Sequence, residues 1–171
     1  MIRRALVADV DAIMTIVGEA QRALAEIGID QWQDGYPSRD IILEDIAAGV
    51  GYVCALEGKV VGYAAIVLTG EEVYNQIKAS DWNTANDYVV LHRLCVLGCV
   101  RRSGVAVELM RYAAALARQN SLTAFRIDTH RGNIRMLSML DKLGFVPTGT
   151  IRYDSGERIA YDLDLSLSKT L

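Results

Sequence analysis

The first part of the chain combines helical and strand patterns of apolar residues. A helix is predicted from Asp9, its N-cap, to Gly28, because apolar residues recur every three or four positions between them. Ser38 is the expected N-cap of a second helix that ends near Gly49. Shorter β-rich runs predict strands at residues 2–6, 51–56 and 60–68, the last two joined as a hairpin at residues 57–59.

Strands and helices alternate in the second part of the chain. Residues 88–97 are mostly apolar and predict a strand buried on both faces, and residues 103–120 carry the apolar stripe of a helix. We then expect, in order, a strand, a helix stopped by Gly144 and a closing strand pair, at residues 122–128, 133–143, 145–150 and 158–165. This order predicts an α/β layer with at least one parallel βαβ crossover.

Length and composition indicate one globular domain. The chain has 171 residues, of which 51% are hydrophobic, and residues 1–171 contain no repeat or linker that would mark a boundary. No apolar run approaches the roughly 20 residues that cross a bilayer, and no signal-like stretch follows the start. Cys54, Cys95 and Cys99 are odd in number and typical of reduced thiols. We therefore expect a cytoplasmic protein that does not bind membranes.

Charge excludes one class of partner and favours another. A net charge of −3 and a pI near 5.4 argue against a nucleic-acid-binding protein, which needs a concentrated basic face. Eight arginines nevertheless lie between residues 93 and 135, and such a local positive field suits a small polyanionic ligand. We expect no metal, because Cys95 and Cys99 lack a second pair at zinc-site spacing.

The most informative segment follows the strand at residues 88–97. It has the pattern Arg101-x-x-Gly104-x-Ala106 where the next helix begins. The first turn of a helix leaves N–H groups without partners and carries a partial positive charge. Small residues there let a ligand approach the backbone, so the pattern predicts a pyrophosphate site with charge added by Arg101 and Arg102. Close packing of the helix on the sheet explains the small residues equally well.

Two motifs together resemble those of a known superfamily. The Arg-x-x-Gly-x-Ala segment resembles the Arg/Gln-x-x-Gly-x-Gly/Ala signature of the GNAT superfamily of acyl-CoA-dependent N-acetyltransferases. About thirty residues later, residues 133–145 resemble its second motif, Asn-x-x-Ala-x-x-x-Tyr-x-Lys-x-Gly-Phe. The resemblance spans nearly the whole chain. It implies a single GNAT-like α/β (α+β) domain with a central mixed, mostly antiparallel sheet, a parallel βαβ crossover and helices on both faces.

The resemblance implies acetyl-CoA as the acyl donor and assigns roles to residues of this chain. In the family, the main chain of the strand before the first motif pairs with the pantetheine arm, which here falls on Leu94, Cys95 and Val96. Asn133 would also reach the cofactor. The pyrophosphate would lie on the amides of the loop and helix start, at Arg101, Arg102, Ser103, Gly104, Val105 and Ala106.

One position departs from the family pattern. The family often has a tyrosine that protonates the leaving thiolate where this chain has Leu140. We expect Leu140 to point toward the cofactor without replacing that acid, so that the thiol leaves as a thiolate or takes a proton from water. Tyr153 and Tyr161 are alternative proton donors that the sequence does not place.

Acetyl transfer requires a neutral amine, although a free amine has a pKa near 10. Many family members have a glutamate three or four residues before the position of Val96, where this chain has Arg93 and His92. Only His92 can act as a base there, so we expect it to be catalytic; a histidine held by packing is the alternative. We expect a loop or capping role for His130 and an inert Cys95, which favours direct transfer in a ternary complex.

Aromatic residues beside carboxylates mark two candidate walls for the acceptor. Trp32 and Tyr36 share a loop with Asp30 and Asp34, where the family commonly builds its acceptor wall. Aromatic faces beside carboxylates attract a cationic amine, but a lid packed on the core is the alternative. A second set offers the same two interpretations: Glu71, Glu72, Trp82 and Tyr88.

The predicted function is therefore transfer of an acetyl group from acetyl-CoA to a primary amine, with a small molecule as the expected acceptor. A peptide or protein N-acetyltransferase and a non-catalytic acyl-CoA-binding regulator are the alternatives. Acetyl-CoA and an amine are the expected partners. The sequence identifies neither the amine nor the oligomeric state, and a homodimer stays open.

Overall fold

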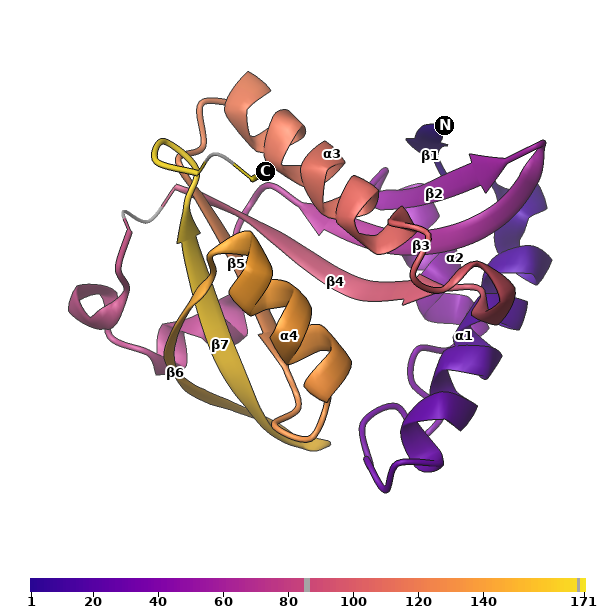
Figure 1. The fold of residues 1–171 in the computed structure, drawn as a ribbon, viewed down its shortest axis with the longest axis horizontal. Helices are drawn as coiled ribbons and strands as arrows, with labels where there is room; N and C mark the ends of the chain where they lie inside the picture. The colour runs from indigo at the N-terminus through magenta and orange to yellow at the C-terminus, as the bar shows by residue number, and fades with distance from the viewer. Residues whose placement is uncertain (85–86, 169) are drawn as a thin grey trace. The chain divides into compact units, whose positions relative to one another are not determined.

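The computed structural model describes residues 1–84, 87–168 and 170–171 (Figure 1). Strands and helices follow one another as β1 (Ile2–Arg4), α1 (Val10–Ala25), α2 (Arg39–Ala47), β2 (Gly51–Leu56), β3 (Lys59–Val67), β4 (Tyr88–Val96), α3 (Val105–Gln119), β5 (Ala124–Thr129), α4 (Ile134–Leu143), β6 (Val146–Tyr153) and β7 (Gly156–Asp164). The described residues also include four short 3₁₀ helices, η1 (Val7–Asp9), η2 (Glu72–Gln76), η3 (Ala79–Asp81) and η4 (Gly98–Val100). Hydrogen bonding orders the strands β1-β2-β3-β4-β5-β7-β6.

The sheet is mixed, as predicted. Strands β4 and β5 are parallel and are connected through α3, which gives the expected βαβ crossover. The pairs β1–β2, β2–β3, β5–β7 and β6–β7 are antiparallel. The predicted α/β fold class is therefore confirmed.

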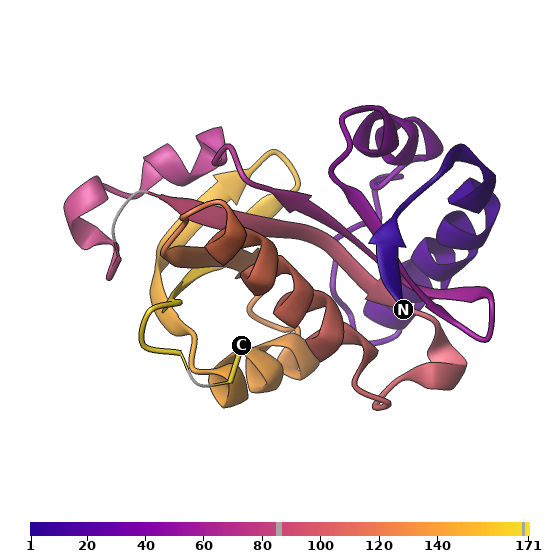
Figure 2. The ribbon, with the colours of Figure 1, turned by 90° about the horizontal axis from the view of Figure 1, so that it is seen from above.

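The chain forms two compact units. The first contains Met1–Ile66 and Leu91–Tyr112, and the second contains Val67–Val90 and Ala113–Leu171. Strand β4 contributes residues to both units and can be followed as one continuous strand in Figure 2.

Both faces of the sheet in the first unit are covered by helices. Tyr63 of β3 belongs to a buried cluster with Ile13 of α1 and Ile42 of α2. A side chain at the neighbouring position, Gly62, would point to the opposite face of the sheet, because side chains alternate along a strand. A Cβ built on Gly62 would lie 2.8 Å from Cγ1 of Val105 in α3. The absence of a side chain at Gly62 therefore allows α3 to lie close to this sheet.

Replacing Gly62 by alanine should lower the free energy of unfolding by about 1–3 kcal/mol, because the added methyl group overpacks the contact with α3. Gly18→Ala is the matched control. A Cβ there would meet a flexible side-chain atom, Nη1 of Arg22, at 3.6 Å, and the helix should gain about 0.5–1 kcal/mol. Denaturant unfolding measures both changes, and equal effects of the two substitutions would contradict the packing role of Gly62.

The second unit is built on β5, β7 and β6 with the first residues of β4. Tyr88–Val90 pair in parallel with Ala124–Arg126. The rings of Phe125 and Phe145 pack edge to face, with their centroids 5.2 Å apart. The polar stretch before β4 contributes aromatic side chains to a buried cluster formed by Tyr74, Ile77, Trp82, Val90, Ile151 and Ala160. This stretch is therefore part of the core and not only a surface connection.

The two capping predictions have different outcomes. Ser38 caps α2, since its Oγ accepts a hydrogen bond from the amide of Ile41 at 3.3 Å. Asp9 occupies the N-cap position of α1, as predicted, but its carboxylate makes no cap bond to this helix. Instead, Oδ2 of Asp9 accepts the amide of Leu6 at 2.8 Å and pairs with Arg3 at 2.6 Å. The 3₁₀ turn η1 precedes α1 and directs this carboxylate back toward β1.

Candidate active site

Strand β4 changes its backbone conformation at Arg93. The φ angle of Arg93 is 56°, in the left-handed region that residues other than glycine seldom adopt. Leu91 and Cys95 are buried on either side of it, whereas His92, Arg93 and Leu94 are half-buried. The irregularity lies between the predicted base and the predicted pantetheine-pairing residues, so simple strand alternation does not relate their orientations.

A buried carboxylate fixes the side chain of Arg93. Its Nε donates to Oδ2 of Asp45 at 2.8 Å, and its Nη2 donates to Oδ1 at 2.6 Å. Asp45, in α2, is 6% exposed and also accepts a hydrogen bond from the Tyr63 hydroxyl at 2.6 Å. Burial by itself would lower the pKa of Arg93, but Tyr36 and Asp45 raise it above its ordinary value, so the guanidinium stays charged. Burial and the bond to Asp45 raise the pKa of Tyr63, which stays a phenol.

Arg93 also holds the loop between α1 and α2. Its Nη1 donates to the hydroxyl of Tyr36 at 2.6 Å. Trp32, whose ring centroid lies 6.4 Å from that of Tyr36, packs against the buried cluster of the first unit. Asp30 and Asp34 are exposed. Trp32 therefore fits the core-packed interpretation, whereas the half-buried Tyr36 has its hydroxyl directed to β4.

The segment that predicted an anion site is an exposed turn followed by a helix. Residues 101–104 are exposed, and α3 begins at Val105, later than expected, because η4 and this turn occupy the preceding residues. Gly104 has a φ of 89°, and a Cβ built on it would meet no described atom within 4 Å. The packing explanation of Gly104 is therefore wrong. Glycine is needed there for the backbone conformation, and it leaves open space at the first turn of α3.

Helix α1 holds the turn that precedes α3. Oε2 of Glu19 accepts the amide of Gly98 at 2.6 Å, and Nη2 of Arg101 donates to the main-chain oxygen of Glu19 at 3.4 Å. The hydroxyl of Ser103 donates to the main chain of η4 at 2.6 Å. Arg102 is exposed and has a φ of 69°. The turn is thus anchored to α1. The first amides of α3 have no partners within the helix, because the first turn of any helix has no preceding carbonyl groups to accept them.

The candidate catalytic residues differ in how deeply they are buried. Cys95 is 4% exposed and burial raises its pKa to about 12, so it is a thiol and not a thiolate at neutral pH. His92 is half-buried in β4, beside Arg93. His130 belongs to the second unit, where its Nδ1 accepts the amide of Gly132 at 3.0 Å, in keeping with the expected loop role.

The second motif lies in the second unit. Oδ1 of Asn133 accepts the amide of Met136 at 3.3 Å and caps α4. The expectation that Leu140 points toward the cofactor is wrong, because Leu140 is 0% exposed and belongs to the core under the apolar face of α4. The hydroxyl of Tyr153 donates to Oδ2 of Asp128 at 3.0 Å. Burial raises the pKa of Tyr161, and the negative charge of nearby Asp141 raises it further.

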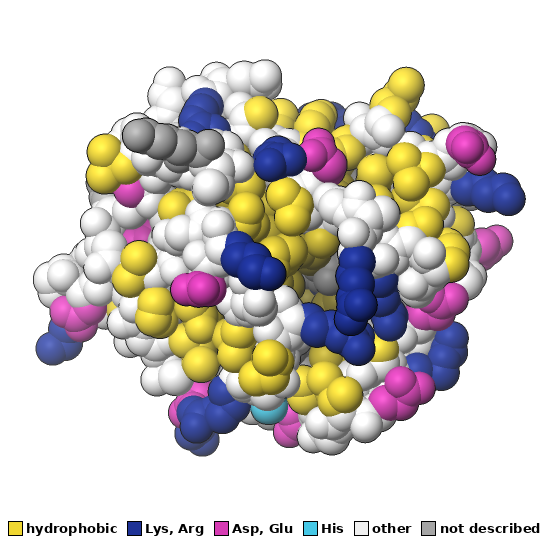
Figure 3. Space-filling model, in the orientation of Figure 1, with side chains coloured by type: hydrophobic (Ala, Val, Ile, Leu, Met, Phe, Trp, Pro, Cys, Tyr) yellow, Lys and Arg dark blue, Asp and Glu magenta, His cyan; other side chains and the backbone are white. Residues whose placement is uncertain are grey.

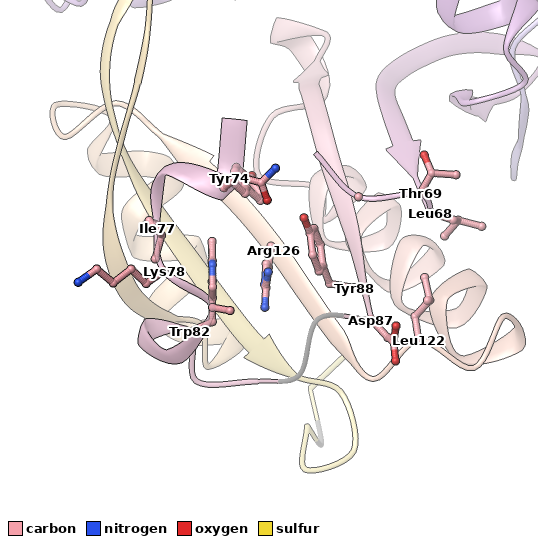
Figure 4. A pocket seen from close by; sticks show the side chains of 13 residues that line it. Leu68, Thr69, Tyr74, Ile77, Lys78, Trp82, Asp87, Tyr88, Leu122 and Arg126 are labelled. Carbon is pink, nitrogen blue, oxygen red and sulfur yellow. The ribbon is translucent and has the colours of Figure 1, made fainter. Parts of the chain in front are cut away.

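The second candidate acceptor wall already holds a cation of the protein itself. The guanidinium carbon of Arg126 lies 3.8 Å from the ring centroid of Trp82 and 4.0 Å from that of Tyr88 (Figure 4). The amide of Glu71 donates to the Tyr88 hydroxyl at 3.3 Å, and Glu72 is exposed. The facing surfaces of Trp82 and Tyr88 are therefore not available to an amine acceptor. The sequence signal for this arrangement is an arginine inside the apolar run of β5.

The arginines concentrated in the third quarter of the chain do not all contribute to a ligand field. Arg93 and Arg126 are committed to internal contacts, while Arg111 pairs with Glu108 and Arg131 with Glu157. On the face shown in Figure 3, the largest group of Lys and Arg side chains lies to the right of the centre. The described residues contain no group of three or more His, Cys, Asp or Glu that could hold a metal ion. Within the same described ranges, no helix is long and apolar enough to span a membrane.

Comparison with known proteins identifies the family. The profile of the acetyltransferase (GNAT) family matches residues 17–145. The chain therefore belongs to this family, and the predictions of a GNAT fold and of an acyltransferase enzyme class are confirmed at family level.

Individual relatives agree with this assignment. The crystal structure of a GNAT-family acetyltransferase from Streptococcus agalactiae is 35% identical, with a TM-score of 0.85 over 96% of this chain and 94% of that one. GCN5-related N-acetyltransferase 6, chloroplastic, from Arabidopsis thaliana is 29% identical over 87 residues, which are 50% of this chain but only 30% of that protein. The ribosomal-protein-alanine N-acetyltransferase of Brucella melitensis shares the fold at 18% identity, with a TM-score of 0.68 over 96% of this chain and 99% of that one.

Proposed function

We propose that residues 1–171 act as one N-acetyltransferase domain that transfers an acetyl group from acetyl-CoA to a primary amine. The observation that carries this proposal is the environment of Gly104. Its left-handed backbone and the open space around it fit a ligand that lies directly on the first turn of α3. A helix N-terminus next to an exposed Arg102 suits the pyrophosphate of such a donor.

Residues around this turn would hold the donor. The amides from Arg101 to Ala106 would receive the pyrophosphate, and the main chain of Leu94, Cys95 and Val96 would pair with the pantetheine arm, as the family resemblance implies. The family resemblance also assigns Asn133 to the cofactor, and in this structure its side chain caps α4. We expect acetyl-CoA to bind in the micromolar range, the lower part of the range usual for enzyme substrates.

The acceptor would lie beside Tyr36 and the irregular part of β4. Because Asp45 balances the charge of Arg93, an incoming ammonium group would not meet an uncompensated cation there. His92 would remove the proton that the amine must lose before it attacks the thioester. The raised pKa of Cys95 supports direct transfer to the amine, because a neutral thiol is a weak nucleophile.

A peptide or protein acceptor is the second candidate, since the Brucella melitensis protein of the same fold is named for a ribosomal-protein alanine. We favour a small amine because the loop of Trp32 and Tyr36 packs on the core and is tied to Arg93, which narrows this side of the site. Release of free thiol from acetyl-CoA, measured with a panel of small amines and of peptides with free N-termini, distinguishes the two. Acetyl-CoA binding without thiol release for any acceptor would favour the regulator alternative.

His92→Ala should lower kcat by about 10²-fold or more, with a smaller effect on acetyl-CoA binding, because it removes the general base. The acidic limb of the pH dependence of kcat should also change in this variant. His130→Ala is the matched control, since its loop contact lies in the second unit and should leave the rate unchanged. An unchanged rate and pH profile in the His92 variant would show that His92 is not the general base and that it is a histidine held by packing.

A further inference from the structure

Asp45 is a buried carboxylate to which the proposed reaction assigns no step. It lies in α2, outside both sequence motifs, and is 6% exposed. Two N–H groups of Arg93 and the hydroxyl of Tyr63 donate to it at distances of 2.6–2.8 Å. Burying such an ion pair adds little to stability compared with apolar side chains of similar volume. The main consequence of the pair is therefore the orientation that Asp45 imposes on Arg93.

Asp45 holds the guanidinium of Arg93 at two points. Its two oxygens accept Nε and Nη2, so the planar group has one orientation, and Nη1 is directed to Tyr36, whose hydroxyl accepts it at 2.6 Å. The main chain of Arg93 has a φ of 56°, a conformation that persists only where the surrounding structure enforces it. Asp45 therefore determines where Arg93 meets the loop between α1 and α2.

This loop, residues 29–37, has one anchor on α1 and another on β4. On α1, Nε2 of Gln21 donates to the main-chain oxygen of Tyr36 at 3.0 Å. On β4, Arg93 binds the hydroxyl at the other end of the same residue. Tyr36 is half-buried, so part of it stays accessible, and its ring centroid lies 6.4 Å from that of Trp32 in the same loop. Loss of the β4 anchor should free the Tyr36 side chain where the acceptor is expected.

We propose that Asp45 is a positioning residue for the acceptor. Acting through Arg93, it holds the ring and hydroxyl of Tyr36 in the place where the amine binds. Because Asp45 is itself buried, it acts without touching the amine. This inference rests on the proposed acetyl transfer, and it adds a residue of α2 that determines how efficiently the amine is used.

Asp45→Asn tests the proposal directly. The amide keeps the shape of the side chain but presents its NH₂ group to one N–H of Arg93, so the two-point contact is lost. We expect kcat/KM for the most active amine to fall by about 10- to 100-fold, as it does for a misplaced binding group. Acetyl-CoA affinity should stay within about twofold of the parent, because the donor is bound by other residues.

Asp9→Asn is the matched control. Asp9 is 8% exposed and accepts two hydrogen bonds from Arg3, of 2.6 and 2.8 Å. Its substitution breaks an equivalent pair that includes neither Arg93 nor the loop, and kcat/KM for the amine should not change. Equal losses of kcat/KM in the Asp45 and Asp9 variants would overturn the proposal.

A double-mutant cycle with Tyr36→Phe tests the route. If Asp45 acts through Arg93 on the Tyr36 hydroxyl, the double variant should lose no more kcat/KM than the more severely affected single variant. An uncompensated Arg93 would also repel an ammonium group, but that effect does not involve the Tyr36 hydroxyl and would add to the loss in Tyr36→Phe. Additive losses would therefore overturn the proposal. If circular dichroism shows that Asp45→Asn is unfolded, Arg93→Lys, which keeps the charge without the planar fork, replaces it in the cycle.

The fluorescence of Trp32 tests the anchor without turnover. In Trp82→Phe, Trp32 is the only tryptophan of the chain, and it shares the loop with Tyr36. Asp45→Asn and Tyr36→Phe in this background should each increase the quenching of its emission by acrylamide, whereas Asp9→Asn should not. Absence of thiol release with every acceptor would contradict acetyl transfer, while increased quenching would still support the anchor. Unchanged quenching in both the Asp45 and Tyr36 variants would overturn the proposal.

Discussion

Replacing Arg93 by alanine should lower the free energy of unfolding by about 3–5 kcal/mol, because it leaves the buried carboxylate of Asp45 without its charge partner. The side chains of the pair are only 13% and 8% exposed, and their two bonds of 2.6 and 2.8 Å are lost together. The Tyr63 hydroxyl would remain on Asp45 as a neutral donor, which does not replace a guanidinium. Denaturant unfolding followed by circular dichroism measures the change.

The matched control is an ion pair of similar length on the surface. Arg39 and Asp11 meet at 2.6 Å, but their side chains are 55% and 86% exposed. Arg39→Ala should therefore cost less than about 1 kcal/mol. If Arg93→Ala cost no more than Arg39→Ala, the buried network would not be a determinant of stability. Asp45→Asn, which keeps the shape of the side chain, is the milder test if the Arg93 variant does not fold.

Gly104→Val should largely abolish acetyl-CoA binding, because valine cannot hold the left-handed backbone easily and its branched side chain occupies the open space at the first turn of α3. The backbone strain costs about 1–2 kcal/mol of stability for an ordinary residue and more for a β-branched one. Isothermal titration with acetyl-CoA gives the affinity, and thermal unfolding reports the strain separately.

Gly58→Val separates strain from the loss of a binding surface. Gly58, in the turn between β2 and β3, has a φ of 78°, and a Cβ there would also meet no described atom within 4 Å. Its substitution should lower stability to a similar extent and leave acetyl-CoA affinity unchanged. An affinity within a few-fold of the parent in Gly104→Val would place the pyrophosphate elsewhere.

Local patterns predict much of this fold. The strand and helix order follows from apolar periodicity, and two short motifs identify the family. Element ends differ by a few residues where a turn competes with a helix, as at Val105, which follows η4. Asp9 is the N-cap residue of α1, but the partners of its carboxylate could not be predicted, because capping rules consider only the helix that follows, whereas η1 and Arg3 decide the orientation of this carboxylate.

The side-chain network around Arg93 could not be predicted in the same way. Its members, Tyr36, Asp45, Tyr63 and Arg93, are far apart in the sequence, and none of them follows a motif. Arg126 is a similar case, since a charged residue in a strand normally predicts an exposed face. Periodicity gives the face of an element, but it does not show which distant side chain will meet it there.

The positions of the two tryptophans have a consequence for how the protein can be observed while it unfolds. Trp32 packs on the core of the first unit, and Trp82 lies on Arg126 in the second. Each indole therefore reports on one unit by its own intrinsic emission, without an added label. Single-tryptophan chains, unfolded in parallel, reveal whether the two halves lose their structure in one cooperative transition or in succession, because coincident midpoints are the signature of a single cooperative unit.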